Sequence, residues 1–114
     1  TGKLFSFCCM APAILKSKDK KVINFLKKLG YEIGLLFQIA DDLIDYKGST
    51  KKAGKKTRKD QKKGKATLIS LLGYKNAVKY SDKIKFNITN KLKKYRNHSK
   101  DINDTLNYIV KRSK

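Results

Sequence analysis

Three of the chain's nine acidic side chains lie within five positions of one another, at Asp41, Asp42 and Asp45. In a helix, residues four apart share a face, so Asp41 and Asp45 would project side by side with Asp42 flanking them. Grouped carboxylates suit a hard cation such as Mg²⁺, which keeps several waters and takes one or two carboxylates together with phosphate oxygens of a substrate. The spacing alone is equally compatible with a helix N-cap or a solvated acidic patch.

Further motifs flank these aspartates. The chain opens with Thr-Gly, Gln38 precedes the aspartates, and two Gly-Lys pairs follow at Lys55 and Lys65. The full order is Thr-Gly, Phe-Gln-x-x-Asp-Asp-x-x-Asp, Gly-Lys and Asp-x-x-x-Gly-Lys-x-Thr. This ordered set resembles the C-terminal part of the trans-polyprenyl diphosphate synthases, and the segments 67–73 and 106–114 look most like bacterial farnesyl diphosphate synthases.

The resemblance extends over residues 1–114 and implies the C-terminal fragment of a single all-helical prenyl synthase domain. Members of this family join an allylic diphosphate to isopentenyl diphosphate. The resemblance therefore implies a Mg²⁺-dependent prenyltransferase that makes farnesyl diphosphate from geranyl or dimethylallyl diphosphate. The family's first aspartate-rich motif is not in this sequence, so the fragment alone is expected to be inactive. A synthase of another chain length is an alternative, because product length depends on residues near that first motif.

The resemblance also assigns roles to the acidic and basic motifs. Asp41, Asp42 and Asp45 match the family's second aspartate-rich motif. Asp41 is expected to bind Mg²⁺ directly, and the other two through waters. Lys55 and Lys65 match the lysines that reach the allylic diphosphate, where an ammonium on a flexible stem suits phosphate oxygens.

The remaining expected site residues come from three separate parts of the chain. Gln38 and Thr1 match positions whose oxygens face the developing allylic cation. Arg112 and Lys114 match the basic C-terminal tail that helps to close the site over isopentenyl diphosphate, although a solvated chain end would look the same. Family members are commonly homodimers, and a cytoplasmic location is expected.

Apolar periodicity predicts the helices that must position these residues. A long helix is expected over residues 18–46, with Ser17 or Asp19 as its N-cap. Gly30 and Gly34 lie four residues apart in it and cost roughly 1 kcal/mol each in helix propensity, so we expect another helix or substrate to approach closely there. Its apolar side chains recur every three or four residues and form one stripe: Val22, Leu26, Leu29, Ile33, Phe37, Ala40 and Ile44.

Shorter helices are expected on either side of the long one. Residues 3–15 predict a helix disturbed at Pro12, because proline lacks an N–H and clashes with the preceding turn. Residues 47–64 hold three glycines and many lysines without apolar periodicity, which predicts a loop. Further helices are expected over residues 66–72, 74–95 and from Asp101 or Asn103 onward. The fold is thus predicted to be all-α, the C-terminal part of an isoprenoid-synthase helical bundle, with too few helices to cover the long helix's stripe.

The charge balance leaves one function of a different class open. The formal net charge is +20, with 26 lysines and 3 arginines. Such a charge is typical of nucleic-acid partners, but phosphate forks and base readout favour arginine, so many of these lysines are expected to be a solvated face. A basic helical nucleic-acid-binding module is the alternative, and filter binding across salt concentrations would reveal it by a steep salt dependence. The sequence contains no run of about 18 uncharged apolar residues, so no transmembrane span is predicted.

Overall fold

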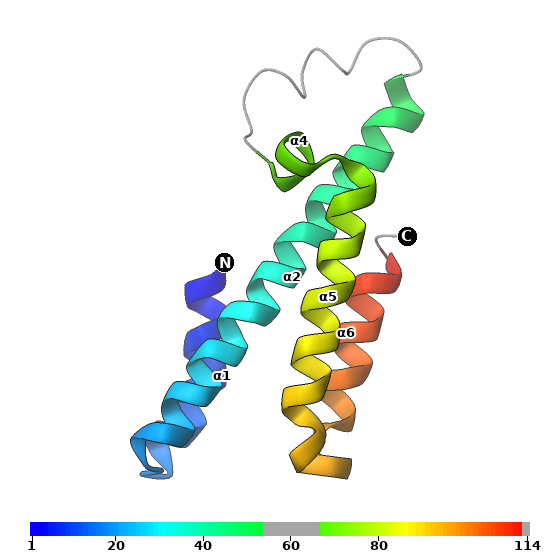
Figure 1. Cartoon of the computed structure of the whole chain (residues 1–114). Coiled ribbons are helices and arrows are strands. Elements are labelled where there is room, and N and C mark those ends of the chain that lie inside the picture. The colour runs from blue at the N-terminus through cyan, green and yellow to red at the C-terminus, as the bar shows by residue number, and fades with distance from the viewer. Residues whose placement is uncertain (54–66, 113–114) are drawn as a thin grey trace.

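The computed structural model describes residues 1–53 and 67–112, with the side chains of residues 49–53 left out. Every regular element in these ranges is helical, which confirms the predicted all-α class (Figure 1). The elements are α1 (Gly2–Leu15), α2 (Lys20–Ala53), α4 (Leu68–Leu72), α5 (Tyr74–Leu92), the 3₁₀ helix η1 (Lys93–Ser99) and α6 (Lys100–Arg112). None of the described helices is both long enough and apolar enough to cross a membrane.

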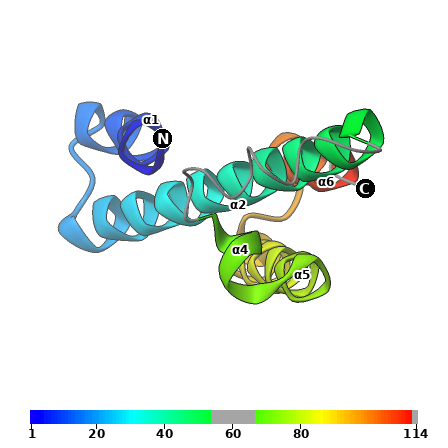
Figure 2. The same cartoon turned by 90° about the horizontal axis from the view of Figure 1, so that it is seen from above.

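The long helix α2 is the element on which the others are arranged. Helix α1 packs along its N-terminal half, and α5 and α6 form an antiparallel pair that also contacts α2 (Figures 1 and 2). The prediction of a loop from residue 47 is wrong for residues 47–53, because α2 continues to Ala53. Lysine is a good helix former, and the density of lysines there did not exclude a helix. The rest of the predicted loop lies outside the described residues.

The turn from α1 into α2 is built from local hydrogen bonds. Helix α1 continues past Pro12 to Leu15, so the proline does not end the helix, although its missing N–H leaves one backbone hydrogen bond unmade. Ser17 takes a left-handed conformation (φ 52°), and the Lys18 N–H donates to the Ala13 carbonyl, as in a Schellman motif. The Asp19 carboxylate then accepts from the Val22 N–H at 3.1 Å, which confirms Asp19 as the N-cap of α2.

Gly30 and Gly34 of α2 lie where α1 crosses it. A Cβ on Gly30 would stand 2.5 Å from the Ser6 Cα atom, and one on Gly34 would stand 2.9 Å from the Gly2 Cα atom. The Ser6 hydroxyl is buried and donates to the Lys27 carbonyl at 3.1 Å. The expected close approach at these glycines is confirmed, and the partner is helix α1.

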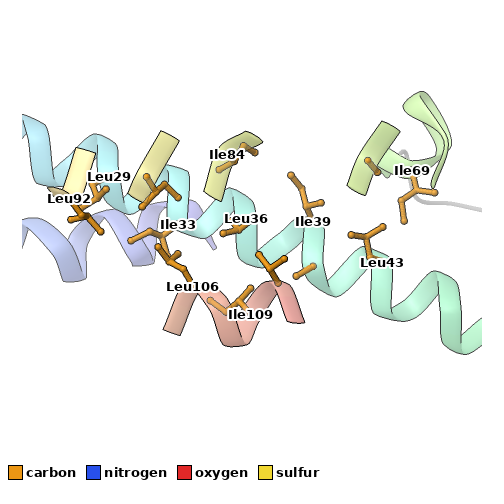
Figure 3. Packing of buried hydrophobic residues seen from close by; sticks show 14 residues of the cluster. Leu29, Ile33, Leu36, Ile39, Leu43, Ile69, Ile84, Leu92, Leu106 and Ile109 are labelled. Atoms are coloured by element: carbon orange, nitrogen blue, oxygen red, sulfur yellow. The ribbon is translucent and has the colours of Figure 1, made fainter. Parts of the chain in front are cut away.

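The core lies between α2 and the α5–α6 pair. In Figure 3 α2 runs between α5 and α6, and Ile69 of α4 points toward the part of α2 that carries Leu43. Outside the core, Lys91 of α5 forms an ion pair with Glu32 of α2. The core side chains are Leu29, Ile33, Leu36, Ile39, Ala40 and Leu43 of α2, Ile69 of α4, Ala77, Ile84, Ile88 and Leu92 of α5, and Leu106, Ile109 and Val110 of α6.

The expectation that much of the α2 stripe would stay uncovered is wrong. All seven predicted stripe residues are buried or half-buried, because α1, α5 and α6 together cover them. Four exposed apolar side chains lie on α1, at Leu4, Phe7, Ile14 and Leu15, and others are scattered over α2, α4, α5 and α6. Phe7 and Ile14 follow Leu4 by three and ten residues and Leu15 follows it by eleven, so at 3.6 residues per turn all four lie within about 100° of one another around α1.

Candidate functional site

The three aspartates lie well inside α2, toward its C-terminal half. Asp41 and Asp42 are half-buried and Asp45 is exposed. Because α2 begins at Lys20, none of the three can serve as its N-cap, and that alternative is excluded. Since the segment is continuously helical, Asp41 and Asp45 share a face, as predicted.

Arg112, at the end of α6, reaches this aspartate face. Its Nη2 atom donates to Asp41 Oδ1 at 2.7 Å, and its guanidinium carbon lies 4.8 Å from the centroid of the Phe37 ring. Phe37 and Asp41 are one helical turn apart, so together they offer the guanidinium an aromatic face and a carboxylate. Sequence reasoning named Arg112 and Asp41 separately but missed their contact and the part that Phe37 plays. In the sequence, the four-residue spacing of Phe37 and Asp41 was the only feature that indicated a shared binding position for a cation.

The Arg112–Asp41 pair is accessible to solvent. The arginine and aspartate side chains are 29% and 39% exposed. Exposed ion pairs contribute about 0.2–1 kcal/mol, and an exposed cation–π contact about 0.5–1 kcal/mol. The pair is therefore weak enough for another cation to replace it.

Gln38 is exposed and lies next to the aspartates. Its amide donates to Asp42 Oδ1 at 3.3 Å, one turn further along α2. The amide nitrogen is therefore turned toward Asp42, which leaves the amide oxygen as the group that could face a cation.

Thr1 lies near the same part of α2. Gly2, the next residue, packs against Gly34, which is one turn before Gln38 on α2. The Phe5 and Phe37 rings, with centroids 5.5 Å apart, hold the two helices together beside this point. The Thr1 hydroxyl makes no hydrogen bond that caps α1. The structure thus brings the Thr1 end of α1 to the part of α2 that carries Gln38.

Three predicted site residues, Lys55, Lys65 and Lys114, lie outside the described residues. The prediction that Lys55 and Lys65 reach the allylic diphosphate therefore stays a prediction. Arg112 is described, and its contact is with Asp41.

The donor set on α2 can be compared with what Mg²⁺ requires. Within residues 1–53 and 67–112, no three His, Cys, Asp or Glu side chains come together closely enough to hold a metal ion. A preformed three-carboxylate site is therefore not present in this part of the chain. The accessible carboxylates of Asp41 and Asp45 on one helix face do fit the other mode, in which Mg²⁺ takes one or two carboxylates and keeps its waters until phosphate oxygens arrive.

The chain is an all-helical bundle with an aspartate-rich motif on its longest helix. Comparison with known proteins identifies the family to which a chain of this class belongs. Residues 1–109 match the model of the polyprenyl synthetase family, so the chain belongs to that family. The predicted family is confirmed. No solved structure gave a significant match.

Several curated relatives are similar to parts of the chain. It is 45% identical over 67 residues to a decaprenyl-diphosphate synthase of Dictyostelium discoideum, which covers 59% of this chain and 15% of the relative. It is 40% identical over 77 residues to a farnesyl diphosphate synthase of Bacillus subtilis, and the aligned region covers 68% of this chain and 26% of that relative. A farnesyl diphosphate synthase of Micrococcus luteus is 29% identical over 114 residues, and the aligned region covers 100% of this chain and 39% of that relative. The chain thus spans well under half the length of these relatives.

Proposed function

We propose that this chain takes part in prenyl transfer by supplying the aspartate-rich wall that ionises an allylic diphosphate. The overall reaction would condense geranyl diphosphate with one isopentenyl diphosphate, or dimethylallyl diphosphate with two in succession, to give farnesyl diphosphate, with Mg²⁺ as cofactor. The observation that carries the proposal is the gathering of Asp41, Asp42 and Gln38 of α2 with Arg112 of α6, beside the Thr1 end of α1. Family membership supports it.

In the proposed reaction the C–O bond of the allylic diphosphate breaks and inorganic diphosphate leaves. The alkene of isopentenyl diphosphate attacks the allylic cation, a C–C bond forms and a proton is lost. Bound Mg²⁺ would neutralise the charge that builds up on the leaving diphosphate. Asp41 would hold the metal directly, and Asp42 and Asp45 would hold it through waters.

The other residues would orient the substrates and stabilise charge. The Gln38 amide oxygen, which its bond to Asp42 leaves free, and the Thr1 hydroxyl would face the developing cation. Lys55 and Lys65 would bind the allylic diphosphate. Lys114 would help to cover isopentenyl diphosphate, together with Arg112 once that side chain leaves Asp41.

We further propose that the chain needs residues beyond these 114 for turnover and that the active enzyme is a homodimer. The sequence contains a single Asp-Asp-x-x-Asp motif. Ionising a diphosphate in a site closed to water requires opposing charge from more than one wall. The relatives are all much longer than the region they share with this chain.

A chimera tests the proposal directly. In the Micrococcus luteus enzyme, the segment aligned with this chain would be replaced by residues 1–114, and isopentenyl transfer to geranyl diphosphate would be measured with and without Mg²⁺. We expect Mg²⁺-dependent activity from the chimera and none from the chain alone. A folded, dimeric chimera without activity would contradict the proposal.

The farnesyl product is the finer part of the proposal. It rests on the relatives named farnesyl diphosphate synthases, while another relative is named a decaprenyl-diphosphate synthase. A second chimera would place this chain in the Dictyostelium discoideum enzyme, and product length would be compared between the two. A C15 product from both would show that this chain limits elongation. Product length that follows the host enzyme would show that these 114 residues do not set it, as expected if residues near the first aspartate-rich motif control it.

A further inference from the structure

Asp41, the expected direct ligand of Mg²⁺, already has a cation in this structure. The Arg112 guanidinium donates to its Oδ1 atom at 2.7 Å. The same guanidinium lies over the ring of Phe37, one turn earlier on α2. An arginine held by both a carboxylate and an aromatic face occupies a built position and is not a solvated chain end.

Both sides of this contact are anchored by packing. Ile109 and Val110 of α6 are buried and belong to the same core cluster as Leu36 of α2 (Figure 3). The Phe37 ring is in turn packed against Phe5 of α1. The helices therefore bring Arg112 to Asp41, while the arginine side chain itself, 29% exposed, can leave without moving α6.

We propose that Arg112 is the resident counterion of Asp41, and that a divalent metal must displace it in order to bind. This inference rests on the proposed function, because it takes Asp41 as a metal ligand. The guanidinium takes one lone pair of Oδ1 and places a positive charge beside the carboxylate, so a divalent metal at Asp41 meets competition for that oxygen and charge repulsion. Once displaced, Arg112 carries a planar fork of donors that suits the phosphate oxygens arriving with the metal. The exchange would thus keep Asp41 neutralised when the site is empty and release Arg112 for the substrate when it is filled.

The proposal predicts a measurable competition. An exposed ion pair and an exposed cation–π contact together correspond to about a three- to thirtyfold change in an equilibrium constant. Removing the guanidinium should therefore tighten metal binding at Asp41 by about that factor. The effect should shrink in 0.5 M salt, because screening already weakens the exposed pair.

Titration of the 114-residue chain with Mg²⁺ alone, followed by NMR, tests this. The backbone amide of Asp41 reports the metal, and the side-chain Nε–H of Arg112 reports release of the guanidinium. In the wild type we expect both signals to shift with one midpoint. In Arg112→Gln the Asp41 midpoint should fall about three- to thirtyfold. In Arg112→Lys, which keeps the charge but loses the planar fork, the midpoint should lie between those of the wild type and Arg112→Gln.

Lys111→Gln is the matched control, because it removes the same charge from the exposed neighbouring residue. Its midpoint should stay within about twofold of the wild type, since only general screening changes. Equal midpoints in Arg112→Gln and Lys111→Gln, or an Asp41 shift without an Arg112 shift, would overturn the inference and leave the metal role of Asp41 standing. Absence of any Asp41 response in all four chains would overturn the metal role and the inference with it.

Discussion

Gly30 of α2 lies so close to Ser6 of α1 that a Cβ atom on the glycine would stand 2.5 Å from the Ser6 Cα atom. The Ser6 hydroxyl fixes the crossing by donating to the Lys27 carbonyl. One turn further along α2, Gly34 meets Gly2 in the same way. These contacts set the position of α1 on α2, and with it the position of Thr1 relative to Gln38.

Gly30→Ala should therefore destabilise the chain. The added methyl would meet backbone atoms of α1, which cannot turn aside as a side chain could, and overpacking of this kind costs about 1–3 kcal/mol. This cost exceeds the gain of roughly 1 kcal/mol in helix propensity. Urea denaturation followed by circular dichroism would measure the change.

Gly48→Ala is the matched control, because a Cβ there would meet nothing within 4 Å. The same gain in helix propensity should then raise stability by up to about 1 kcal/mol. If Gly30→Ala is as stable as Gly48→Ala, α1 does not cross α2 at Gly30 as described.

Gly30 and Gly34 also show how much of the structure could be predicted from the sequence. Two glycines four residues apart in a strongly periodic helix indicate a close neighbour, and the structure has one. The pattern could not say whether helix or substrate approaches, because helical spacing describes one element and not its partner. Likewise, spacing placed Asp41 and Asp45 on one face, but Arg112 is 71 residues away from Asp41 and no local pattern pairs them.

Asp41→Ala in the active chimera should lower turnover sharply, by about 10²–10⁴-fold, because transition-state charge stabilisation is lost. Protein yield should change little, since Asp41 is half-buried and its ion pair is weak. Asp104→Ala, which removes an exposed carboxylate from α6, is the control and should retain full turnover. Turnover of Asp41→Ala within threefold of the parent would rule out the metal role.

The adjacent cysteines should differ in reactivity. Burial raises the pKa of the Cys9 thiol, and the neighbouring Cys8 raises it further, whereas the Cys8 side chain is exposed. Because the thiolate is the nucleophile, a raised pKa leaves less of Cys9 reactive at pH 8. Brief treatment with iodoacetamide, followed by peptide mass spectrometry, should show alkylation mainly at Cys8. Equal labelling in the folded chain would contradict the packing of Cys9 against the core, and urea should abolish the difference.

Copies of this chain should associate through the outer face of α1. Phe7 and Leu15 are 59% and 84% exposed there, and apolar patches of this kind mark interfaces. Two chains of charge +20 repel each other, but α1 carries Lys3 as its only charged residue, so repulsion is least at this helix. Sedimentation at low micromolar concentration should therefore detect oligomers, and a hydrophobic dye should bind the remaining monomer.

Substitutions on two helices locate this association. Phe7→Ser, alone or with Leu15→Ser, should shift the chain to monomer and reduce dye binding, because it removes the apolar contact from α1. Phe86→Ser is the control: Phe86 is a similarly exposed phenylalanine, 64% accessible, but lies on α5 among lysines. If Phe86→Ser dissociates the oligomer as well as Phe7→Ser does, the contact is not specific to α1. A wild-type chain that sediments as a monomer, unfolds cooperatively and binds no dye would show that the outer face of α1 does not drive association.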